Sequence, residues 1–292
     1  MKLKEVLDKS IQFFKDKKID SPRLSAELLI ADALKLDRMQ LYLKYESPLT
    51  EDEVAKCRDY IKRHSQGEPV AYITGNKGFF GDIYNVGAGV LIPRPETEGL
   101  VEEALKWINQ TKPIKLSILD LGAGSGCIGF SILKQCLKNK NQNFEEIKLT
   151  SVEKSKEAFK YLAENSKKLE LESKATLVND DVLNYLKNQN DLFDIIVSNP
   201  PYIDPNDVRV EKHVKEYEPN EALFANDQGL NCLKTWSSSA LFKLKPSAIL
   251  LLEMGCDQGQ AMKNYLESKQ NFKNVDIIKD LSGLDRIIKA IT

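Results

Sequence analysis

Apolar residues recur at helical spacing through roughly the first 75 residues of the chain. The stretch "LKEVLDKSIQFF" spaces them three and four positions apart, as an amphipathic helix requires. A second helix is predicted to start at Pro22 with Ser21 as its cap, and "TEDE" at residues 50–53 predicts a capping box for another. Residues 1–75 are therefore predicted to form a small helical domain.

Glycines, aromatic residues and short alternation replace this pattern between residues 72 and 98. Such a texture predicts one or two β-hairpins. We expect residues 76–98 to be a hairpin linker that joins the helical domain to a second domain, residues 99–292.

From about residue 99, strand-like apolar runs alternate with helical stretches. The predicted strands are "KLSILDLG" (115–122), "IKLTSVE" (147–153), "ATLVNDD" (175–181), "FDIIVSN" (193–199) and "AILLLEMG" (248–255). Repeated βα units of this kind predict an α/β fold with a doubly wound, mostly parallel sheet. Ligands of such sheets bind at the carboxyl ends of the strands, so the candidate chemistry lies there.

Composition narrows the class of protein. The 292 residues are 42% hydrophobic and 29% charged. No window approaches the roughly 20 apolar residues of a membrane span, and the amphipathic, charged first residues do not predict a signal peptide. We therefore expect a cytoplasmic protein without a membrane partner. Forty-two basic and 43 acidic residues give a net charge of −1, which provides no general attraction to nucleic acid.

Cysteines and histidines do not suggest a metal site. The five cysteines are scattered and never spaced C-x-x-C, so we expect reduced structural thiols and no metal. His64, in a predicted helix, and His213, in a predicted charged loop, lie outside every motif and are both predicted to be solvated.

A glycine-rich segment, "DLGAGSGCIG" at residues 120–129, follows the first strand of the sheet. Its glycines allow a tight turn and a close approach of backbone to ligand. The segment also matches a dinucleotide fingerprint, so NAD binding is one possible role. A tight turn without any ligand is the other alternative to the cofactor considered next. Asp120 and Glu153 favour another nucleoside cofactor, because a carboxylate after the second strand can accept both ribose hydroxyls. This arrangement resembles the class I S-adenosylmethionine-dependent methyltransferases.

The fourth strand ends in Asn199-Pro200-Pro201-Tyr202, a position predicted to lie beside the first strand and its glycine segment. Prolines lack N–H donors and fix φ, so their carbonyls are pure acceptors, and Asn199 adds a side-chain carbonyl. Two converging acceptors suit an NH2 group: they orient a nitrogen whose lone pair is delocalised and favour its pyramidalisation. Tyr202 is predicted to stack on a flat substrate. The alternative is a strand end capped by prolines.

Taken with its other motifs, the chain resembles the release factor glutamine methyltransferases (HemK/PrmC family) over nearly its whole length. The supporting motifs are "GEPVAYITG" (67–75), "LIPRPETE" (91–98), "EPNEALFA" (218–225), "LLLEMGCDQG" (250–259) and "LSGLDRII" (281–288). "LIPRPETE" discriminates most, because ribosomal-protein glutamine methyltransferases typically have P-R-S-P there and DNA adenine methyltransferases lack the segment.

The resemblance implies a role for each motif residue. The methionine part of S-adenosylmethionine would be held by the glycine segment, Gly122, Ala123, Gly124, Ser125 and Gly126. Glu153 would bind the ribose, and Asp181 and Val182 would bind the adenine. Asn199 would lie next to the methyl group. The substrate glutamine would contact Asn199, Pro200, Pro201 and Tyr202. Arg94 and Thr97 would shape the same cavity. The catalytic residues would be Asn199, Pro200 and Tyr202. Two positions depart from the family pattern, which usually has Asp at 153 and often an aromatic residue at 182.

The implied reaction is N5-methylation of the glutamine in the Gly-Gly-Gln motif of class I peptide chain release factors, by a monomer whose helical domain recognises the release factor. Three alternatives remain open on the residues. A ribosomal-protein glutamine methyltransferase is disfavoured by "LIPRPETE", and a DNA or RNA adenine-N6 methyltransferase lacks the expected basic groove. A binding module that has lost transfer is disfavoured by the intact motifs.

Overall fold

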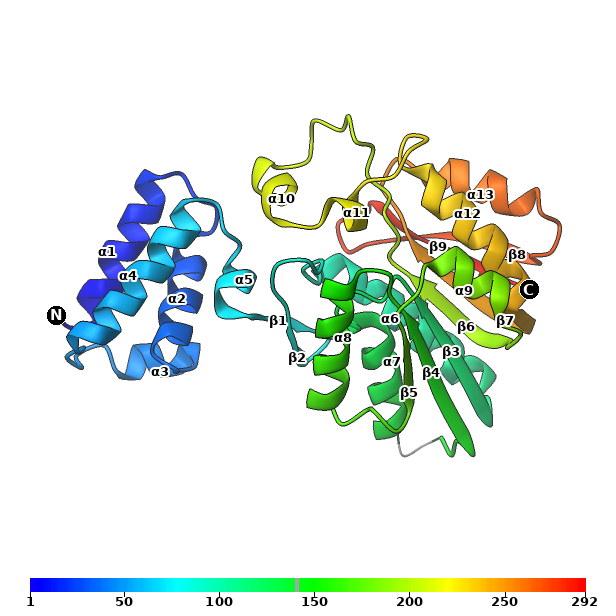
Figure 1. Cartoon of the computed structure of the whole chain (residues 1–292), viewed down its shortest axis with the longest axis horizontal. Helices are drawn as coiled ribbons and strands as arrows, with labels where there is room; N and C mark the ends of the chain where they lie inside the picture. Colours follow the sequence, from blue (N-terminus) through cyan, green and yellow to red (C-terminus); the bar gives the residue numbers. More distant parts are fainter. Residues whose placement is uncertain (140–141) are drawn as a thin grey trace. The chain divides into compact units, whose positions relative to one another are not determined.

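The computed structural model describes residues 1–139 and 142–292, and the chain divides into two compact units. The first comprises residues 1–76 and 212–217, and the second comprises residues 77–211 and 218–292 (Figure 1). Each unit is described by itself. Within the described residues, no helix combines the length and apolar character needed to cross a membrane.

The first unit is helical, as predicted. Its helices are α1 (Leu3–Asp16), α2 (Pro22–Ala33), α3 (Arg38–Leu43), α4 (Glu51–Ser65), α5 (Val70–Thr74) and α10 (Lys212–Tyr217). Side chains from α1, α2 and α4, among them Leu7, Phe14, Leu29, Ile30 and Cys57, form one fully buried apolar core. The apolar stripe that predicted the first helix is therefore the stripe that packs.

The helix starts follow the sequence signals with one exception. Thr50 and Glu53 form the predicted capping box, with Thr50 N–H donating to Glu53 Oε2 at 2.8 Å and Glu53 N–H to Thr50 Oγ1 at 3.2 Å. Pro22 is the first residue of α2, as predicted. The predicted cap by Ser21 is wrong, because Ser21 adopts φ +50° and its side chain makes no capping hydrogen bond to the described residues.

The environment of one of the two histidines differs from the prediction. His64 is half-buried: its Nδ1 lies 2.8 Å from the carbonyl oxygen of Glu68 and its ring packs edge-on against Phe14. Burial lowers the pKa of His64. His213 is exposed as expected, but it lies in helix α10 and not in a loop.

A hairpin of β1 (Asn76–Phe79) and β2 (Asp82–Asn85) lies at the start of the second unit, with Asn76 still counted in the first, and it confirms a hairpin in the 72–98 region. The remaining strands are β3 (Lys115–Leu121), β4 (Glu146–Val152), β5 (Ala175–Val178), β6 (Phe193–Ser198), β7 (Leu244–Glu253), β8 (Asn274–Lys279) and β9 (Asp285–Ile291). The helices are η1 (Pro95–Thr97), α6 (Glu98–Thr111), α7 (Cys127–Lys138), α8 (Lys156–Lys168), α9 (Val182–Asn188), α11 (Asn220–Leu223), α12 (Leu230–Ala240), η2 (Leu241–Lys243) and α13 (Gly259–Glu267).

Seven strands form one sheet in the order β5-β4-β3-β6-β7-β9-β8. The first five are parallel to one another, and β9 runs antiparallel to both β7 and β8. This confirms the predicted doubly wound, mostly parallel sheet. The chain reverses its direction across the sheet at β3 and β6, which pair in register from Ile118–Ile195 to Leu121–Ser198, so their carboxyl ends adjoin.

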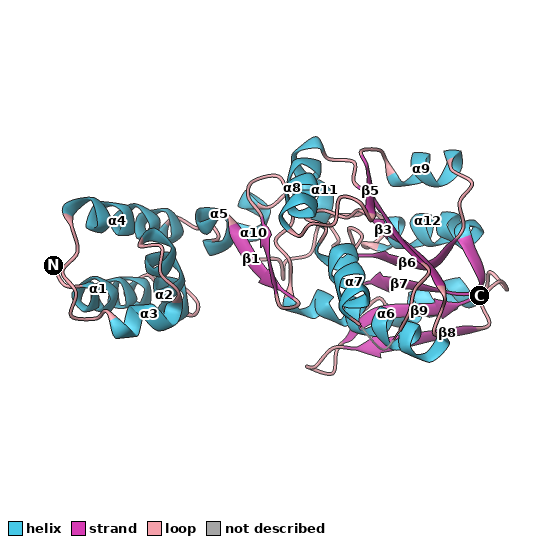
Figure 2. Ribbon diagram, turned by 90° about the horizontal axis from the view of Figure 1, so that it is seen from below, coloured by secondary structure: helices cyan, strands magenta, loops and turns pink. Residues whose placement is uncertain are grey.

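Helices cover both faces of the sheet (Figure 2). One apolar layer joins α6, α7 and α8 to the sheet and the other joins α9, α12 and α13 to it. Alternation along a strand divides its side chains between the two layers: in β3, Ile118 belongs to the first and Leu119 to the second. The strand ends are thereby held rigid where the loops of the candidate site begin.

Candidate functional site

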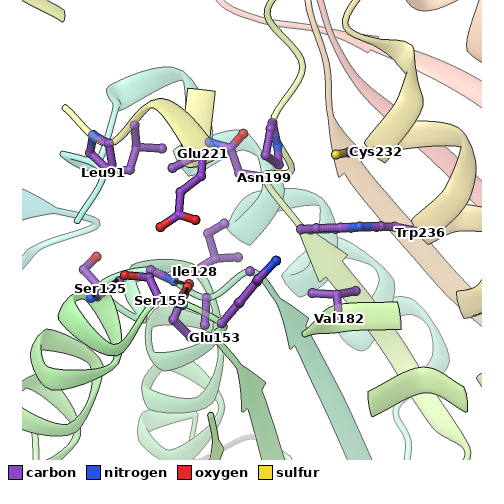
Figure 3. Close-up of a pocket in the computed structure, with 18 of the residues that line it drawn as sticks. Leu91, Ser125, Ile128, Glu153, Ser155, Val182, Asn199, Glu221, Cys232 and Trp236 are labelled. Atoms are coloured by element: carbon purple, nitrogen blue, oxygen red, sulfur yellow. Dashed lines mark hydrogen bonds between the residues drawn. The ribbon is translucent and has the colours of Figure 1, made fainter. Parts of the chain in front are cut away.

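A cavity of about 320 Å³ lies at the carboxyl ends of β3, β4 and β6 (Figure 3). Its walls come from the glycine segment, the loops that follow β4, β5 and β6, the 89–97 segment and helix α12. The lining residues include Gly122, Ala123, Gly124, Ser125, Glu153, Asp181, Val182, Arg94, Thr97, Asn199 and Pro201. The structure therefore brings together most of the residues to which a role was assigned from the sequence.

The glycine segment and Glu153 form one hydrogen-bonded unit. Gly124 N–H donates to Glu153 Oε2 at 2.8 Å, and Ser155 N–H donates to Oε1 at 2.8 Å. The carboxyl group is mostly buried and burial raises its pKa, although these amide donors oppose the change. Each carboxylate oxygen can accept more than one hydrogen bond, so acceptor capacity remains for a ligand.

Gly122 and Gly124 adopt positive φ angles of 66° and 56°, which favour glycine. A Cβ atom at 122 would lie 3.1 Å from the indole ring of Trp236, so close packing also requires a glycine there. A Cβ atom at 124 would come no closer than 3.9 Å to Val90, the nearest side chain outside the segment. Position 124 therefore borders open space in the cavity.

Asp120 supports the glycine segment from below the cavity wall. Its side chain is fully buried, Oδ2 accepts the Gly129 N–H at 3.0 Å, and Oδ1 has no hydrogen-bond partner among the described residues. Burial raises the pKa of Asp120 to about 7; the Gly129 amide opposes this shift and the charge of Glu153 adds to it.

An ion pair with a buried carboxylate and a partly exposed guanidinium holds the "LIPRPETE" segment in place. The Arg94 guanidinium pairs with Glu218 Oε1 and also donates to the Ile92 carbonyl at 3.0 Å. Oε2 of Glu218 accepts the Ile92 N–H at 3.1 Å. Arg94 thus shapes the cavity wall through Glu218 of the "EPNEALFA" segment.

Asn199 lies at the edge of the cavity, where its Nδ2 donates to Thr97 Oγ1 at 3.3 Å. Tyr202 turns the other way, because its hydroxyl donates to Oε1 of buried Glu253 at 2.9 Å and its ring packs in the second apolar layer. Of the four residues 199–202, only Asn199 and Pro201 line the cavity in the described part of the chain. The roles given to Pro200 and Tyr202 stay predictions.

Comparison with known proteins identifies the family. Residues 5–75 match the model of the PrmC N-terminal domain, and residues 104–216 match the methyltransferase small domain. A release factor glutamine methyltransferase of Koribacter versatilis is 34% identical over 289 residues, which cover 99% of this chain and 98% of that protein. Another from Leptospira interrogans is 37% identical, covering 97% and 96%.

The chain belongs to the release factor glutamine methyltransferases. Among solved structures, the hMettl16 catalytic domain in complex with the MAT2A 3'UTR hairpin 6 has a TM-score of 0.52 at 16% identity, covering 73% of this chain and 75% of that one. This likeness extends to the fold only, and it confirms the methyltransferase-like sheet.

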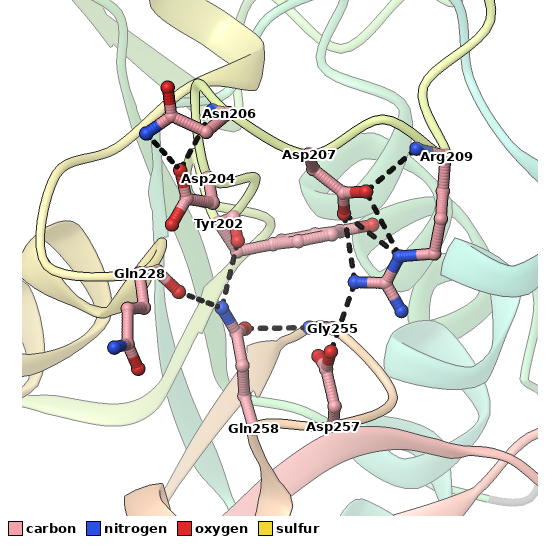
Figure 4. A network of polar contacts seen from close by, with 9 residues as sticks. All are labelled: Tyr202, Asp204, Asn206, Asp207, Arg209, Gln228, Gly255, Asp257 and Gln258. Carbon is pink, nitrogen blue, oxygen red and sulfur yellow. Dashed lines mark hydrogen bonds and ion pairs between the residues drawn. The ribbon is translucent and has the colours of Figure 1, made fainter.

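In this family member, one glutamine ties the Asn-Pro-Pro-Tyr segment to the rest of the site (Figure 4). Gln258 Nε2 donates to the carbonyls of Tyr202 at 2.8 Å and Gln228 at 3.0 Å, and its Oε1 accepts the Gly255 N–H at 2.8 Å. A Cβ atom at Gly229 would collide with the Tyr202 carbonyl, so the backbone approaches closely there. The sequence signalled Gln258 only as part of "LLLEMGCDQG".

Several cavity residues of this family member had no individual signal in the sequence. They are Gly89, Leu91, Ile128, Glu221, Cys232 and Trp236, and Figure 3 shows the Glu221 carboxylate directed into the cavity. Trp236 is on α12, far from every motif, and becomes part of the site only because that helix packs beside the glycine segment. The described residues contain no cluster of His, Cys, Asp or Glu that could hold a metal ion.

Proposed function

We propose that this chain transfers the methyl group of S-adenosylmethionine to the side-chain amide nitrogen of a glutamine in a peptide chain release factor. The observation that carries the proposal is that Gly124, Glu153 and Asn199 line one and the same cavity. One end offers features of a nucleoside cofactor site and the other offers an amide acceptor. The family to which the chain belongs supports the same reaction.

The residues present fit the cofactor. Open space in front of Gly124 suits a close approach of ligand to backbone, and Glu153 keeps acceptor capacity for ribose hydroxyls. Asp181 and Val182, at the start of α9, line the cavity, and we assign the adenine to them. When bound, S-adenosylmethionine supplies an electrophilic methyl group carried on a positively charged sulfur.

The chain's own contribution is alignment of the substrate nitrogen. The Asn199 side-chain carbonyl and the Pro200 backbone carbonyl accept the two amide hydrogens, which fixes the direction of the nitrogen lone pair. Acceptors that act most strongly on the pyramidal nitrogen stabilise the transition state more than the ground state. The bond from sulfur to the methyl group would break with its electron pair kept on sulfur, so that S-adenosylhomocysteine is the product. The methylated nitrogen then loses one proton to water, and we assign no general base to the chain.

The helical unit supplies recognition of the substrate protein in this proposal. Its match to the PrmC N-terminal domain supports a role particular to this family. We place the reaction in translation termination in the cytoplasm and expect the Gly-Gly-Gln glutamine of class I release factors to be the target of a monomeric enzyme.

Mass spectrometry of a release factor incubated with the chain and S-adenosylmethionine tests the proposal. One methyl group on the Gly-Gly-Gln glutamine is expected, and none on a factor carrying Gln→Ala there or on an adenine-containing oligonucleotide. Asn199→Ala should lower transfer by roughly 100-fold or more with nearly unchanged cofactor affinity. Asn206→Ala is the matched control, because Asn206 is exposed in the same segment and, among the described residues, forms its hydrogen bonds within that segment, to Asp204.

Methylation of the oligonucleotide alone would replace the proposed substrate with a nucleic acid. An unmodified release factor in the presence of bound cofactor would contradict the proposal outright.

A further inference from the structure

Trp236 is the one aromatic side chain among the described residues that line the cavity. It lies on α12 and is half-buried, whereas the other tryptophan, Trp107, is 7% exposed and belongs to the first apolar layer. A tryptophan that served packing alone would be covered as Trp107 is. The indole surface that Trp236 presents to the cavity is therefore available to a ligand.

The glycine segment meets the edge of this indole ring and not its face. A Cβ atom at Gly122 would lie 3.1 Å from two adjacent ring atoms of Trp236, Cζ3 and Cη2, and no other ring atom would come within 4 Å of it. Contact limited to two adjacent atoms is contact with the ring edge. Figure 3 shows the ring edge-on, with the side chain of Val182 on the side of one of its faces.

Val182 marks the end of the cavity to which the adenine is assigned. It is buried in the second apolar layer, against which Trp236 also packs, and the helices that carry the two residues, α9 and α12, contact each other. Both residues line the cavity, so they border the same end of it. An aliphatic side chain together with an indole face suits a flat aromatic ligand.

We propose that Trp236 stacks on the adenine ring of S-adenosylmethionine and supplies much of the affinity for the adenosine part of the cofactor. The inference rests on the proposed function for the identity of that cofactor. Stacking of one base on an aromatic side chain contributes about 5- to 150-fold in affinity. Since every base has a π face, Trp236 contributes affinity and not the choice of base.

Tryptophan fluorescence tests the contact directly, because the chain contains two tryptophans. Trp107→Phe changes a residue outside the cavity lining and leaves Trp236 as the only tryptophan. S-adenosylmethionine and 5′-methylthioadenosine share the adenine, and both should quench the emission of this variant. Methionine, which lacks the adenine, should not. In Trp236→Phe, where Trp107 alone emits, S-adenosylmethionine should cause no quenching.

Titration calorimetry measures what the ring contributes to binding. Trp236→Leu keeps an apolar side chain but removes the aromatic face, so it should weaken S-adenosylmethionine and 5′-methylthioadenosine equally, by about 10-fold. Trp236→Phe keeps a smaller aromatic face and should lose about threefold or less. Phe242→Leu is the matched control, because Phe242 is 74% exposed and outside the cavity lining, and it should bind both ligands like the parent.

Two results would overturn the inference while leaving the proposed function in place. One is calorimetric binding of S-adenosylmethionine to Trp107→Phe without any change in emission, and the other is parental affinity in Trp236→Leu. Quenching by methionine and not by 5′-methylthioadenosine would place the indole at the methionine part and contradict the inference as well. A parent that does not bind the cofactor would remove the proposed function and this inference together. A parent that binds the cofactor with quenching, but leaves release factor unmodified, would support the stacking role and count against the proposed function alone.

Discussion

The backbone N–H of Gly124 and the carboxylate of Glu153 are joined by a 2.8 Å hydrogen bond across the carboxyl ends of β3 and β4. The glycine segment and the strand-end acid are therefore one structural element, and damage to either changes the other. A ligand that contacts both meets a surface that is already assembled.

Gly124→Val should abolish measurable binding of S-adenosylmethionine, because the added side chain projects into the cavity at a position that borders open space. Titration calorimetry with the cofactor measures this directly. Gly283→Val is a matched control: Gly283 also has positive φ, at 78°, but it is exposed and outside the cavity lining. Both variants carry the backbone strain of a side chain at positive φ, so only loss of binding specific to position 124 supports the assignment. Full affinity in Gly124→Val would mean that the segment is only a turn.

Glu153→Ala should weaken cofactor binding by about 1.5 to 3 kcal/mol, the scale of hydrogen bonds to a charged acceptor. The substitution also releases the N–H groups of Gly124 and Ser155 that the carboxylate now holds. Calorimetry should show the loss in Glu153→Ala and not in Glu164→Ala, which removes the same charge from an exposed position on α8. Equal affinities for these two variants would remove Glu153 from the cofactor site.

Gln258→Ala should destabilise the second unit by roughly 2 to 4 kcal/mol, because it leaves the carbonyls of Tyr202 and Gln228 and the N–H of Gly255 without their present partner. Methyl transfer should fall as well, since the Tyr202 backbone loses its anchor. Denaturant unfolding followed by tryptophan fluorescence reports on this unit, which contains both Trp107 and Trp236. The exposed Gln260, whose side chain bonds to Asn264 in the described part of the chain, provides Gln260→Ala as the control. A Gln258→Ala variant as stable as that control would refute the anchoring role.

The first unit should lose stability as the pH falls below about 6.5. Burial lowers the pKa of His64, and the charge of His213 acts in the same direction, although the hydrogen bond to Glu68 opposes it. The folded state therefore keeps His64 neutral at a pH where the unfolded chain already binds a proton, so folding is penalised on the acidic side. Urea unfolding monitored by the helical circular dichroism signal should show this decline in the parent and in His213→Asn. A decline of the same size in His64→Gln would assign it to other groups.

The central strands were predictable because parallel strands covered on both faces are nearly continuous apolar runs, as in "DIIVS" of β6 and "AILLLE" of β7. Strands β8 and β9 were not predicted, since charged residues such as Asp276, Arg286 and Lys289 interrupt their apolar pattern. The antiparallel end of the sheet was missed for that reason.

Some residues of the candidate site were predictable from the sequence and others were not. Residues directly after predicted strands, such as Gly124, Glu153 and Asn199, were found because the topology alone brings them to one edge. The partner of Asn199 could not be foreseen in the same manner, since Thr97 lies 102 residues away in sequence and meets it only through tertiary packing. For Tyr202, the motif predicted the position of the residue but not the direction of its side chain. Its hydroxyl donates to Glu253.

The position of β9 between β7 and β8 has a consequence for synthesis on the ribosome. β7 is translated long before β9, and until Ile291 has left the exit tunnel one edge of β7 lacks its antiparallel neighbour. Strand β7 contains Leu250, Leu251 and Leu252, which are fully buried once the fold is complete. An unpaired apolar edge is where nascent chains aggregate or recruit chaperones. Until β9 is added, the second unit therefore has its ligand-binding edge formed and one edge of β7 unpaired.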